Sequence, residues 1–210
     1  MWLGSENQIK CILLRHGRTP SNETGRYLGQ RDEPLSQAGI ARLLEQKEAG
    51  FYPPVDGVVV SPLKRCGQTA ELLWSEIAPK EHIVIPEFRE IDFGKWDGKH
   101  YRELSGDAAY QSWIDSHGEK PFPEGESKRL FIERVMRGWE RLLEMLTCDV
   151  RLRELTSLGL VVHGGTLMAL GSVLCGGDYY DYQIANGCGY EMTLHRGTGQ
   201  IGGWKKRDFS

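Results

Sequence analysis

The sequence contains no apolar run close to the roughly 20 residues that a membrane-spanning helix needs. Its first ten residues, MWLGSENQIK, lack the apolar core of a secretory signal, and Gly4 does not match a myristoylation signal. These absences predict a cytoplasmic protein that has no membrane partner.

The cysteines lack the pairing that disulfide-rich and zinc-binding domains show. Cys11, Cys66, Cys148, Cys175 and Cys188 are scattered and odd in number, and no two of them form a Cys-x-x-Cys pair. This pattern indicates reduced thiols and argues against a disulfide framework or a zinc ribbon. Cys11 and Cys175 lie in apolar stretches, so we expect both of them in the core.

Nucleotide-binding and serine-hydrolase motifs are missing as well. The chain has no Walker A loop, no Gly-x-Gly-x-x-Gly fingerprint and no Gly-x-Ser-x-Gly elbow, so the His-Gly-Gly at 163–165 is a poor match to a hydrolase oxyanion loop. The net charge is −3, and no global basic field points to a nucleic-acid partner. A local basic pocket is compatible with this charge, and no feature of the sequence indicates an oligomeric state.

What is present is an alternation of apolar strands and helices. The 210 residues, 40% of them hydrophobic, suit one domain, residues 1–210, with a substantial core. Four apolar runs that end in polar residues, followed by a final strand pair, predict a three-layer α/β/α sandwich with a mostly parallel central sheet. The expected strands are 10–15, 55–60, 82–88, 158–163, 190–197 and 200–208. The expected helices are 36–50, 63–77, 108–116, 128–146 and 166–177.

Cationic and imidazole side chains follow three of the predicted strands. The first strand ends in Arg15 and His16, the second is followed by Arg65 in the next helix, and the fourth ends in His163. Because working residues of such sheets lie at the carboxyl ends of the strands, we expect these four side chains to converge. Two clustered guanidinium groups and nearby helix N-termini match phosphate oxygens, so the sequence predicts a phosphate pocket that needs no metal and no cofactor.

The imidazoles suggest how such a pocket would work. A neutral imidazole can attack phosphorus if a backbone carbonyl near Gly17 holds its other nitrogen, and the product is a phosphohistidine that water then opens. A carboxyl group must protonate the leaving oxygen. The loop after the third strand offers Glu87, Glu90, Asp92 and Asp97, and the residues alone do not separate them.

Four motifs in this order, LLRHGRTPSN, SPLKRCGQTAE, FREIDFGKWDG and VVHGGTL, resemble those of the histidine phosphatase superfamily. They span residues 12–167. The resemblance implies the following roles, given in chain order: phosphate binding by Arg15, nucleophilic attack by His16, phosphate binding by Asn22 and Arg65, proton donation by Glu90, and catalysis and phosphate binding by His163, with Gly164 as a further phosphate-binding position.

Members of this superfamily either transfer phosphate within a sugar acid or release it to water. The segment after residue 99 is compact, carries Tyr101, Tyr110, Trp113 and Phe122, and is followed by Pro-Glu-Gly-Glu-Ser. It resembles the phosphatase branch, especially its α-ribazole phosphatase-like and broad-specificity members. We expect these aromatic residues to roof the pocket and to favour an aromatic or nucleotide-like leaving group in a small-molecule phosphomonoester. The alternatives are a phosphoglycerate mutase and a binding member of the superfamily that has lost catalysis.

Overall fold

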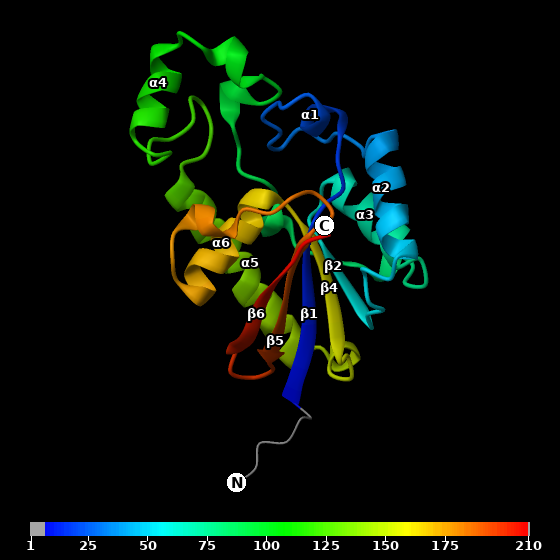
Figure 1. Cartoon of the computed structure of the whole chain (residues 1–210). Coiled ribbons are helices and arrows are strands. Elements are labelled where there is room, and N and C mark those ends of the chain that lie inside the picture. Colours follow the sequence, from blue (N-terminus) through cyan, green and yellow to red (C-terminus); the bar gives the residue numbers. More distant parts are fainter. Residues whose placement is uncertain (1–6, 210) are drawn as a thin grey trace.

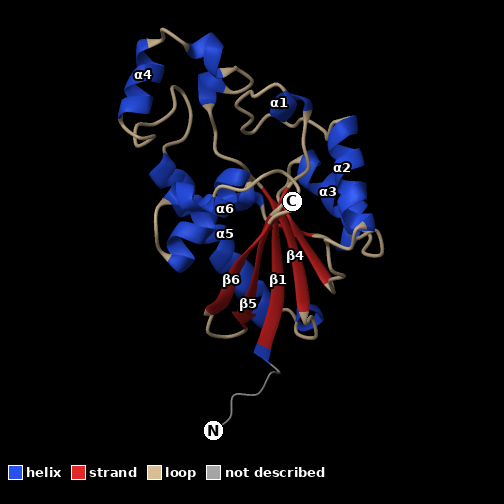
Figure 2. Ribbon diagram, in the orientation of Figure 1, coloured by secondary structure: helices blue, strands red, loops and turns tan. Residues whose placement is uncertain are grey.

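The computed structural model describes residues 7–209, which form a six-stranded sheet in the order β3-β2-β4-β1-β5-β6 (Figure 2). Strands β1 to β4 are parallel, whereas β5 is antiparallel to both of its neighbours. The strands are β1 Gln8–Arg15, β2 Gly57–Val60, β3 Ile83–Val84, β4 Ser157–Val162, β5 Gly189–His195 and β6 Ile201–Arg207.

Helices cover both faces of the sheet, so the predicted three-layer α/β/α sandwich is confirmed (Figure 1). One face packs on α2 and α3, and the other packs on α5 and α6. The helices are α1 Pro20–Glu23, α2 Gln37–Glu48, α3 Lys64–Leu73, α4 Ala108–Asp115, α5 Lys128–Cys148 and α6 Gly164–Cys175. Short 3₁₀ turns are η2 Pro79–Glu81, η3 Pro86–Phe88, η4 Gly94–Trp96, η5 Tyr101–Leu104, η6 Val150–Leu152 and η7 Tyr179–Tyr182. None of the helices among residues 7–209 is long and apolar enough to cross a membrane.

The alternation of side chains along β1 divides the core into two clusters. Ile12 and Leu14 pack toward α2 and α3, whereas Cys11 and Leu13 pack toward α5 and α6. On α5 an apolar stripe that includes Phe131 and meets this second cluster is buried, as the helical spacing predicts.

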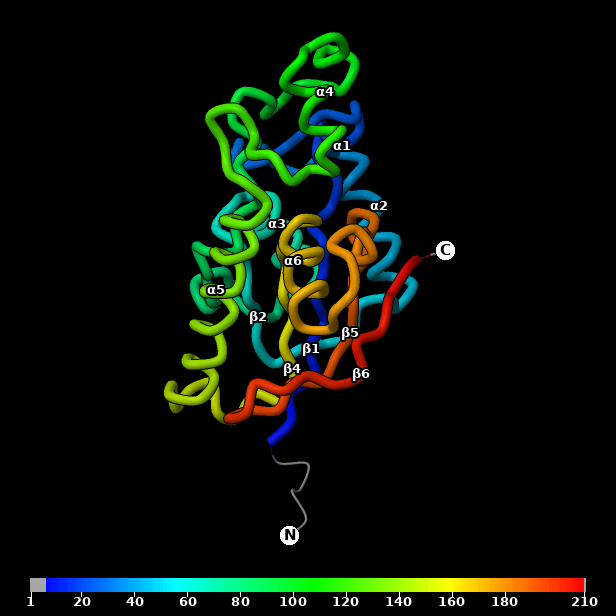
Figure 3. Tube along the Cα trace, turned by 90° about the vertical axis from the view of Figure 1, so that its left-hand side faces the viewer, coloured from blue at the N-terminus to red at the C-terminus, as the bar shows by residue number. Residues whose placement is uncertain are grey.

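Register brings the ends of the central strands to one level. Arg15 pairs with Val162 across β1 and β4, and Val60 pairs with Val161 across β2 and β4. The residues that follow these strands therefore emerge side by side at the carboxyl edge of the sheet. Figures 1 and 3 both show α4 and its flanking loops standing beyond this edge.

Local sequence signals explain where several helices begin and end. The Ser36 hydroxyl accepts a hydrogen bond from the Gly39 N–H at 2.9 Å and caps α2, as predicted. Helix α3 ends at Leu73, earlier than predicted, because Trp74 leaves the helix and packs its indole ring against β4 at Gly159. A Cβ at Gly159 would lie 2.3 Å from that ring, so only glycine accommodates this contact.

Three further sequence-based expectations were wrong in detail. The predicted third strand holds only two strand residues, because Pro86 has no N–H to donate and starts a 3₁₀ turn. The second strand begins at Gly57 instead of Val55. Cys175 is exposed at the end of α6, although Cys11 is buried as expected.

Candidate active site

The two histidines that follow β1 and β4 lie next to each other. The rings of His16 and His163 are 5.2 Å apart between centroids and meet edge to face. The positive charges of Arg65 and Arg15 are close enough to both rings to lower their pKa values, in addition to the larger effect of burial. The structure thus brings together the four side chains that the strand ends predict.

The ring of His16 is held by the backbone of the next residue. His16 Nδ1 lies 2.6 Å from the carbonyl oxygen of Gly17, so Nδ1 carries the hydrogen and Nε2 keeps its lone pair. The Gly17 N–H in turn donates to the Thr69 hydroxyl at 3.0 Å. A Cβ at Gly17 would lie 2.5 Å from the Leu43 side chain, so glycine lets Leu43 pack closely against the backbone here.

His163 is fully buried at the start of α6. Its Nε2 atom is 2.7 Å from the Ser61 hydroxyl, which comes from the end of β2. Ser61 thereby fixes the ring orientation and occupies one of the two ring nitrogens.

Arg65 is fully buried, Arg15 is partly buried at the cavity, and neither forms an ion pair with an acidic side chain of residues 7–209. Arg15 donates to the Ile184 carbonyl at 2.8 Å, and Arg65 donates to the carbonyls of Gly29 and Arg31 at 2.7 and 2.8 Å. The Nε atoms of both arginines are buried and have no hydrogen-bond partner. No ion pair involves either guanidinium within residues 7–209. Buried positive charge of this kind is costly unless an anion joins it.

Glu90 is the carboxyl group of the 87–97 loop that reaches the cavity. Its two oxygens accept hydrogen bonds from the Ile91 and Gly165 N–H groups at 2.9 and 3.1 Å. Burial raises the pKa of Glu90 above its usual value, which favours the protonated form that a general acid needs. Gly165 permits this contact because a Cβ there would lie 2.3 Å from Glu90 Oε1.

The other carboxyl groups of the loop have structural partners. Glu87 pairs with Arg141 at 3.4 Å, and Asp92 accepts from the Gly94 N–H at 2.8 Å. Asp97 accepts from two backbone N–H groups of the 29–31 loop. The structure therefore separates four candidates that the sequence alone leaves equivalent.

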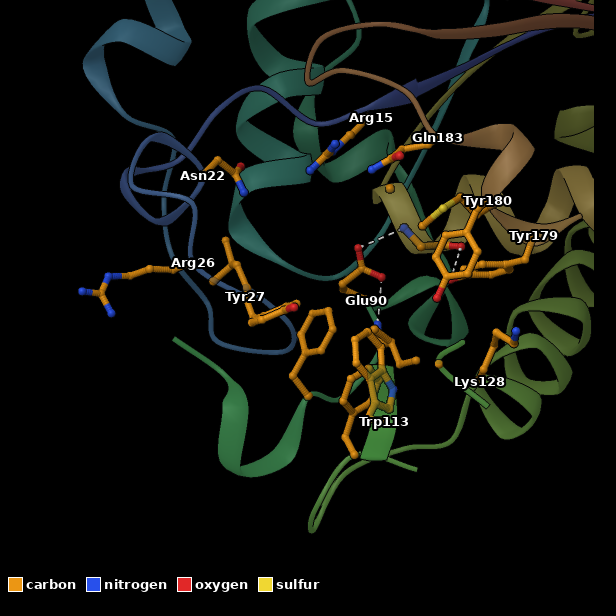
Figure 4. A pocket seen from close by; sticks show the side chains of 18 residues that line it. Arg15, Asn22, Arg26, Tyr27, Glu90, Trp113, Lys128, Tyr179, Tyr180 and Gln183 are labelled. Carbon is orange, nitrogen blue, oxygen red and sulfur yellow. Dashed lines mark hydrogen bonds between the residues drawn. The ribbon is translucent and has the colours of Figure 1, made fainter. Parts of the chain in front are cut away.

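A cavity of about 300 Å³ opens next to these groups (Figure 4). Arg15, Asn22, Glu90 and Gly164 line its wall, whereas the buried side chains of His16, Arg65 and His163 are not part of the lining. The rest of the lining is largely aromatic and apolar and includes Tyr27, Leu28, Phe93, Trp113, Phe122, Met168, Tyr179 and Tyr180.

Residues 97–127, here called the cap, supply the roof of the cavity. Trp113 and Phe122 line it, as predicted, together with Gly118, whereas Tyr110 and the half-exposed Tyr101 are outside the lining. The Tyr27 and Tyr110 hydroxyls are 2.8 Å apart and join the cap to the loop that follows α1. The cap is thus hydrogen-bonded to the segment that carries part of the cavity wall.

Within residues 7–209 there is no group of three or more histidine, cysteine or acidic side chains that could hold a metal ion. The convergence of buried arginines and histidines at the strand ends can instead bind a tetrahedral oxyanion. The family description "Histidine phosphatase superfamily (branch 1)" matches residues 11–207 of the chain. The chain belongs to the histidine phosphatase superfamily.

Relatives in this superfamily include several named phosphatases. The adenosylcobalamin/α-ribazole phosphatase of Salmonella typhimurium is 30% identical over 194 residues, which cover 90% of this chain and 92% of that protein. Phosphoserine phosphatase 1 of Hydrogenobacter thermophilus is 32% identical over 162 residues, which cover 70% and 74%. The crystal structure of the α-ribazole phosphatase from Shigella flexneri superposes with a TM-score of 0.77 at 25% identity and covers 95% of this chain and 96% of that one. The predicted superfamily and the prediction of a phosphatase are confirmed at this level.

Several residues of this histidine phosphatase that touch the site carry no sequence signal of their own. In the 183–187 segment, the Ile184 carbonyl accepts a hydrogen bond from Arg15. The Asn186 amide donates to the His16 carbonyl and to Asn22 Oδ1. In the sequence, Asn186-Gly187 before the last strand pair is typical of an ordinary turn. These contacts join residues about 170 positions apart, and only the sheet topology reveals them.

The buried imidazoles make the stability of this histidine phosphatase depend on pH. The pKa values of His16 and His163 lie well below 6.5 in the folded chain, so below about pH 6.5 the unfolded chain binds protons that the folded chain does not. The free energy of unfolding should therefore fall with decreasing pH, by at most about 1.4 kcal/mol per pH unit for each histidine.

Urea unfolding at about pH 7.5 and about pH 5.5 tests this expectation. His16→Ala removes one of the two titrating rings, so its loss of stability between the two pH values should be smaller than that of the wild type. His117→Asn changes an exposed histidine with positive φ and should keep the wild-type loss. Equal losses for wild type and His16→Ala would contradict a neutral, buried His16.

Proposed function

We propose that the chain is a metal-independent phosphomonoesterase that works through a phosphohistidine at His16. The observation that carries the proposal is the pair of guanidinium groups of Arg15 and Arg65, which share one site with two neutral imidazoles and form no ion pair among residues 7–209. A phosphoryl group would supply the missing negative charge. At about 4 Å and an effective dielectric constant of about 20, each such charge pair is worth roughly 4 kcal/mol.

In the proposed first step, His16 Nε2 attacks phosphorus and the bond from phosphorus to the leaving oxygen breaks. Glu90 gives its proton to that oxygen, so the alcohol leaves uncharged and Glu90 becomes a carboxylate. Arg15, Arg65 and the ring nitrogen of His163 that does not face Ser61 stabilise the charge that builds up on the equatorial oxygens.

In the second step, water attacks the phosphohistidine as the carboxylate of Glu90 takes its proton. The phosphorus–nitrogen bond breaks, inorganic phosphate forms, and both residues return to their starting states. The hydrogen bond from His16 Nδ1 to the Gly17 carbonyl keeps the ring in the tautomer that both steps require.

We further propose that the leaving group carries a flat aromatic ring. The cavity lining includes the rings of Trp113, Phe122 and Tyr180, and Figure 4 shows Trp113 at the end away from Arg15. Lys128 lies at this end as well, with its Nζ atom 5.7 Å from the centre of the Tyr180 ring. α-Ribazole 5′-phosphate, the kind of substrate named for two of the relatives, fits this description.

A panel of phosphomonoesters tests both parts of the proposal. We expect release of inorganic phosphate without added metal and in the presence of EDTA. The value of kcat/KM should be at least about tenfold higher for α-ribazole 5′-phosphate than for phosphoserine, because stacking on aromatic rings contributes roughly 1–3 kcal/mol. A preference for phosphoserine would refute the aromatic leaving group.

The same panel separates the alternatives. Conversion of 3-phosphoglycerate that depends on added 2,3-bisphosphoglycerate would indicate a mutase. Tight binding of vanadate without turnover of any ester would indicate a member of the superfamily that has lost catalysis.

A further inference from the structure

The amide of Asn22 lies at the cavity wall with its oxygen already occupied. Asn22 Oδ1 accepts hydrogen bonds from the Thr19 N–H at 3.3 Å and from Asn186 Nδ2 at 3.2 Å. No protein acceptor within residues 7–209 binds Asn22 Nδ2. Figure 4 shows the end of the Asn22 side chain turned toward Arg15, on the side where the phosphoryl group would lie.

The orientation of both amides follows from backbone groups that can play only one role. The Thr19 N–H can only donate, so it must face the oxygen of Asn22. The His16 carbonyl can only accept, and it lies 3.0 Å from the amide of Asn186, so it must face Nδ2. The two N–H bonds of Asn186 therefore go to His16 O and Asn22 Oδ1, and the NH₂ group of Asn22 is left to donate into the cavity.

Asn186 is held in place for this task. The next residue, Gly187, donates its N–H to the carbonyls of Arg15 and His16 at 2.9 and 3.3 Å, which fixes the turn against the end of β1. Gly187 has a φ of +77°, a conformation that favours glycine. The His16 carbonyl thus keeps a second donor even if the Asn186 side chain is removed.

We propose that Asn186 is a positioning residue for phosphoryl binding, acting through Asn22. It binds Asn22 Oδ1 and thereby keeps the Asn22 NH₂ group directed at the phosphoryl oxygens. Without Asn186, the Thr19 N–H at 3.3 Å is the remaining donor to Asn22 Oδ1, so one hydrogen bond in place of two holds the amide and its NH₂ group is less firmly directed at the dianion. This inference rests on the proposed phosphatase function.

A double-mutant cycle between Asn22 and Asn186 tests the inference, with kcat/KM for para-nitrophenyl phosphate and the inhibition constant of vanadate as readouts. Asn186→Ala should lower kcat/KM by at least about tenfold and weaken vanadate binding by a similar factor. In the Asn22→Ala background the same change should have an effect of less than about threefold, because the group on which Asn186 acts is already gone.

Ala185→Ser is the matched control, since Ala185 is an exposed neighbour in the same turn and lies outside the cavity wall. It should leave both readouts unchanged. Asn186→Ser, which keeps a polar side chain in the turn, replaces the alanine variant should that variant unfold. Losses that multiply in the double variant, or an unchanged vanadate affinity in Asn186→Ala, would overturn the inference. Neither result would affect the proposed phosphatase function, which the turnover of His16→Ala tests separately.

Discussion

Replacing His16 with alanine is expected to reduce kcat for every phosphomonoester by at least about 10⁴-fold. The ring of His16 is the neutral imidazole with a free Nε2 atom and a fixed tautomer, so no neighbouring group can take over nucleophilic attack. The fold should persist, because the change removes a buried ring next to two positive charges and leaves the Gly17 N–H bonded to Thr69. Release of inorganic phosphate measures the loss, and circular dichroism checks the fold.

Trapping of the intermediate gives this prediction a second readout. After rapid quenching, the wild type should carry a phosphoryl group that is stable in base and labile in acid, and peptide mapping should place it on His16. His82→Gln is a suitable control, because His82 bonds the Ile77 carbonyl and lies outside the cavity wall. A phosphoryl group on another residue would refute the assigned nucleophile.

Glu90→Gln should slow esters with poor leaving groups far more than activated aryl esters. An alkoxide must be protonated as it leaves, and general acid catalysis of such a step is worth about 10²–10⁴-fold, whereas para-nitrophenolate leaves without a proton. We therefore expect a loss of about 10²-fold or more in kcat for alkyl phosphates and a much smaller loss for para-nitrophenyl phosphate.

Glu87→Gln is the matched control, because Glu87 belongs to the same loop, pairs with Arg141 and does not line the cavity. In Glu90→Gln, the new amide can accept a hydrogen bond from only one of the two N–H groups that bind the Glu90 carboxylate. The melting temperature of Glu90→Gln is therefore measured alongside its activity. Equal losses for alkyl and aryl esters would remove Glu90 from the role of proton donor.

The convergence of site residues at one sheet edge was predictable because it depends on local signals. Apolar runs that end in Arg15, His16 and His163 indicate strand ends, and parallel strands bring such ends to the same edge. The aromatic roof was predictable in part, since the composition of the cap does not distinguish Trp113, which lines the cavity, from Tyr101, which does not.

Other features depend on contacts that a linear pattern does not encode. Glu90 is distinguished from Glu87 by the N–H of Gly165, a residue 75 positions away, and Asn186 is connected to Asn22 across 164 positions. The early end of α3 depends on the gap that Gly159 leaves for Trp74. Each of these contacts forms only when segments far apart in the sequence pack together, so the linear pattern does not reveal it.

The missing side chain at position 165 also sets where the acid lies in the cavity. Any Cβ there would lie 2.3 Å from the Oε1 atom of Glu90, in space that the carboxyl group now occupies. Because this oxygen is the end of a flexible side chain, a larger residue would push the carboxyl group aside without forcing it out of the cavity. Glycine at position 165 therefore couples the location of the proposed proton donor to a residue far from its own loop.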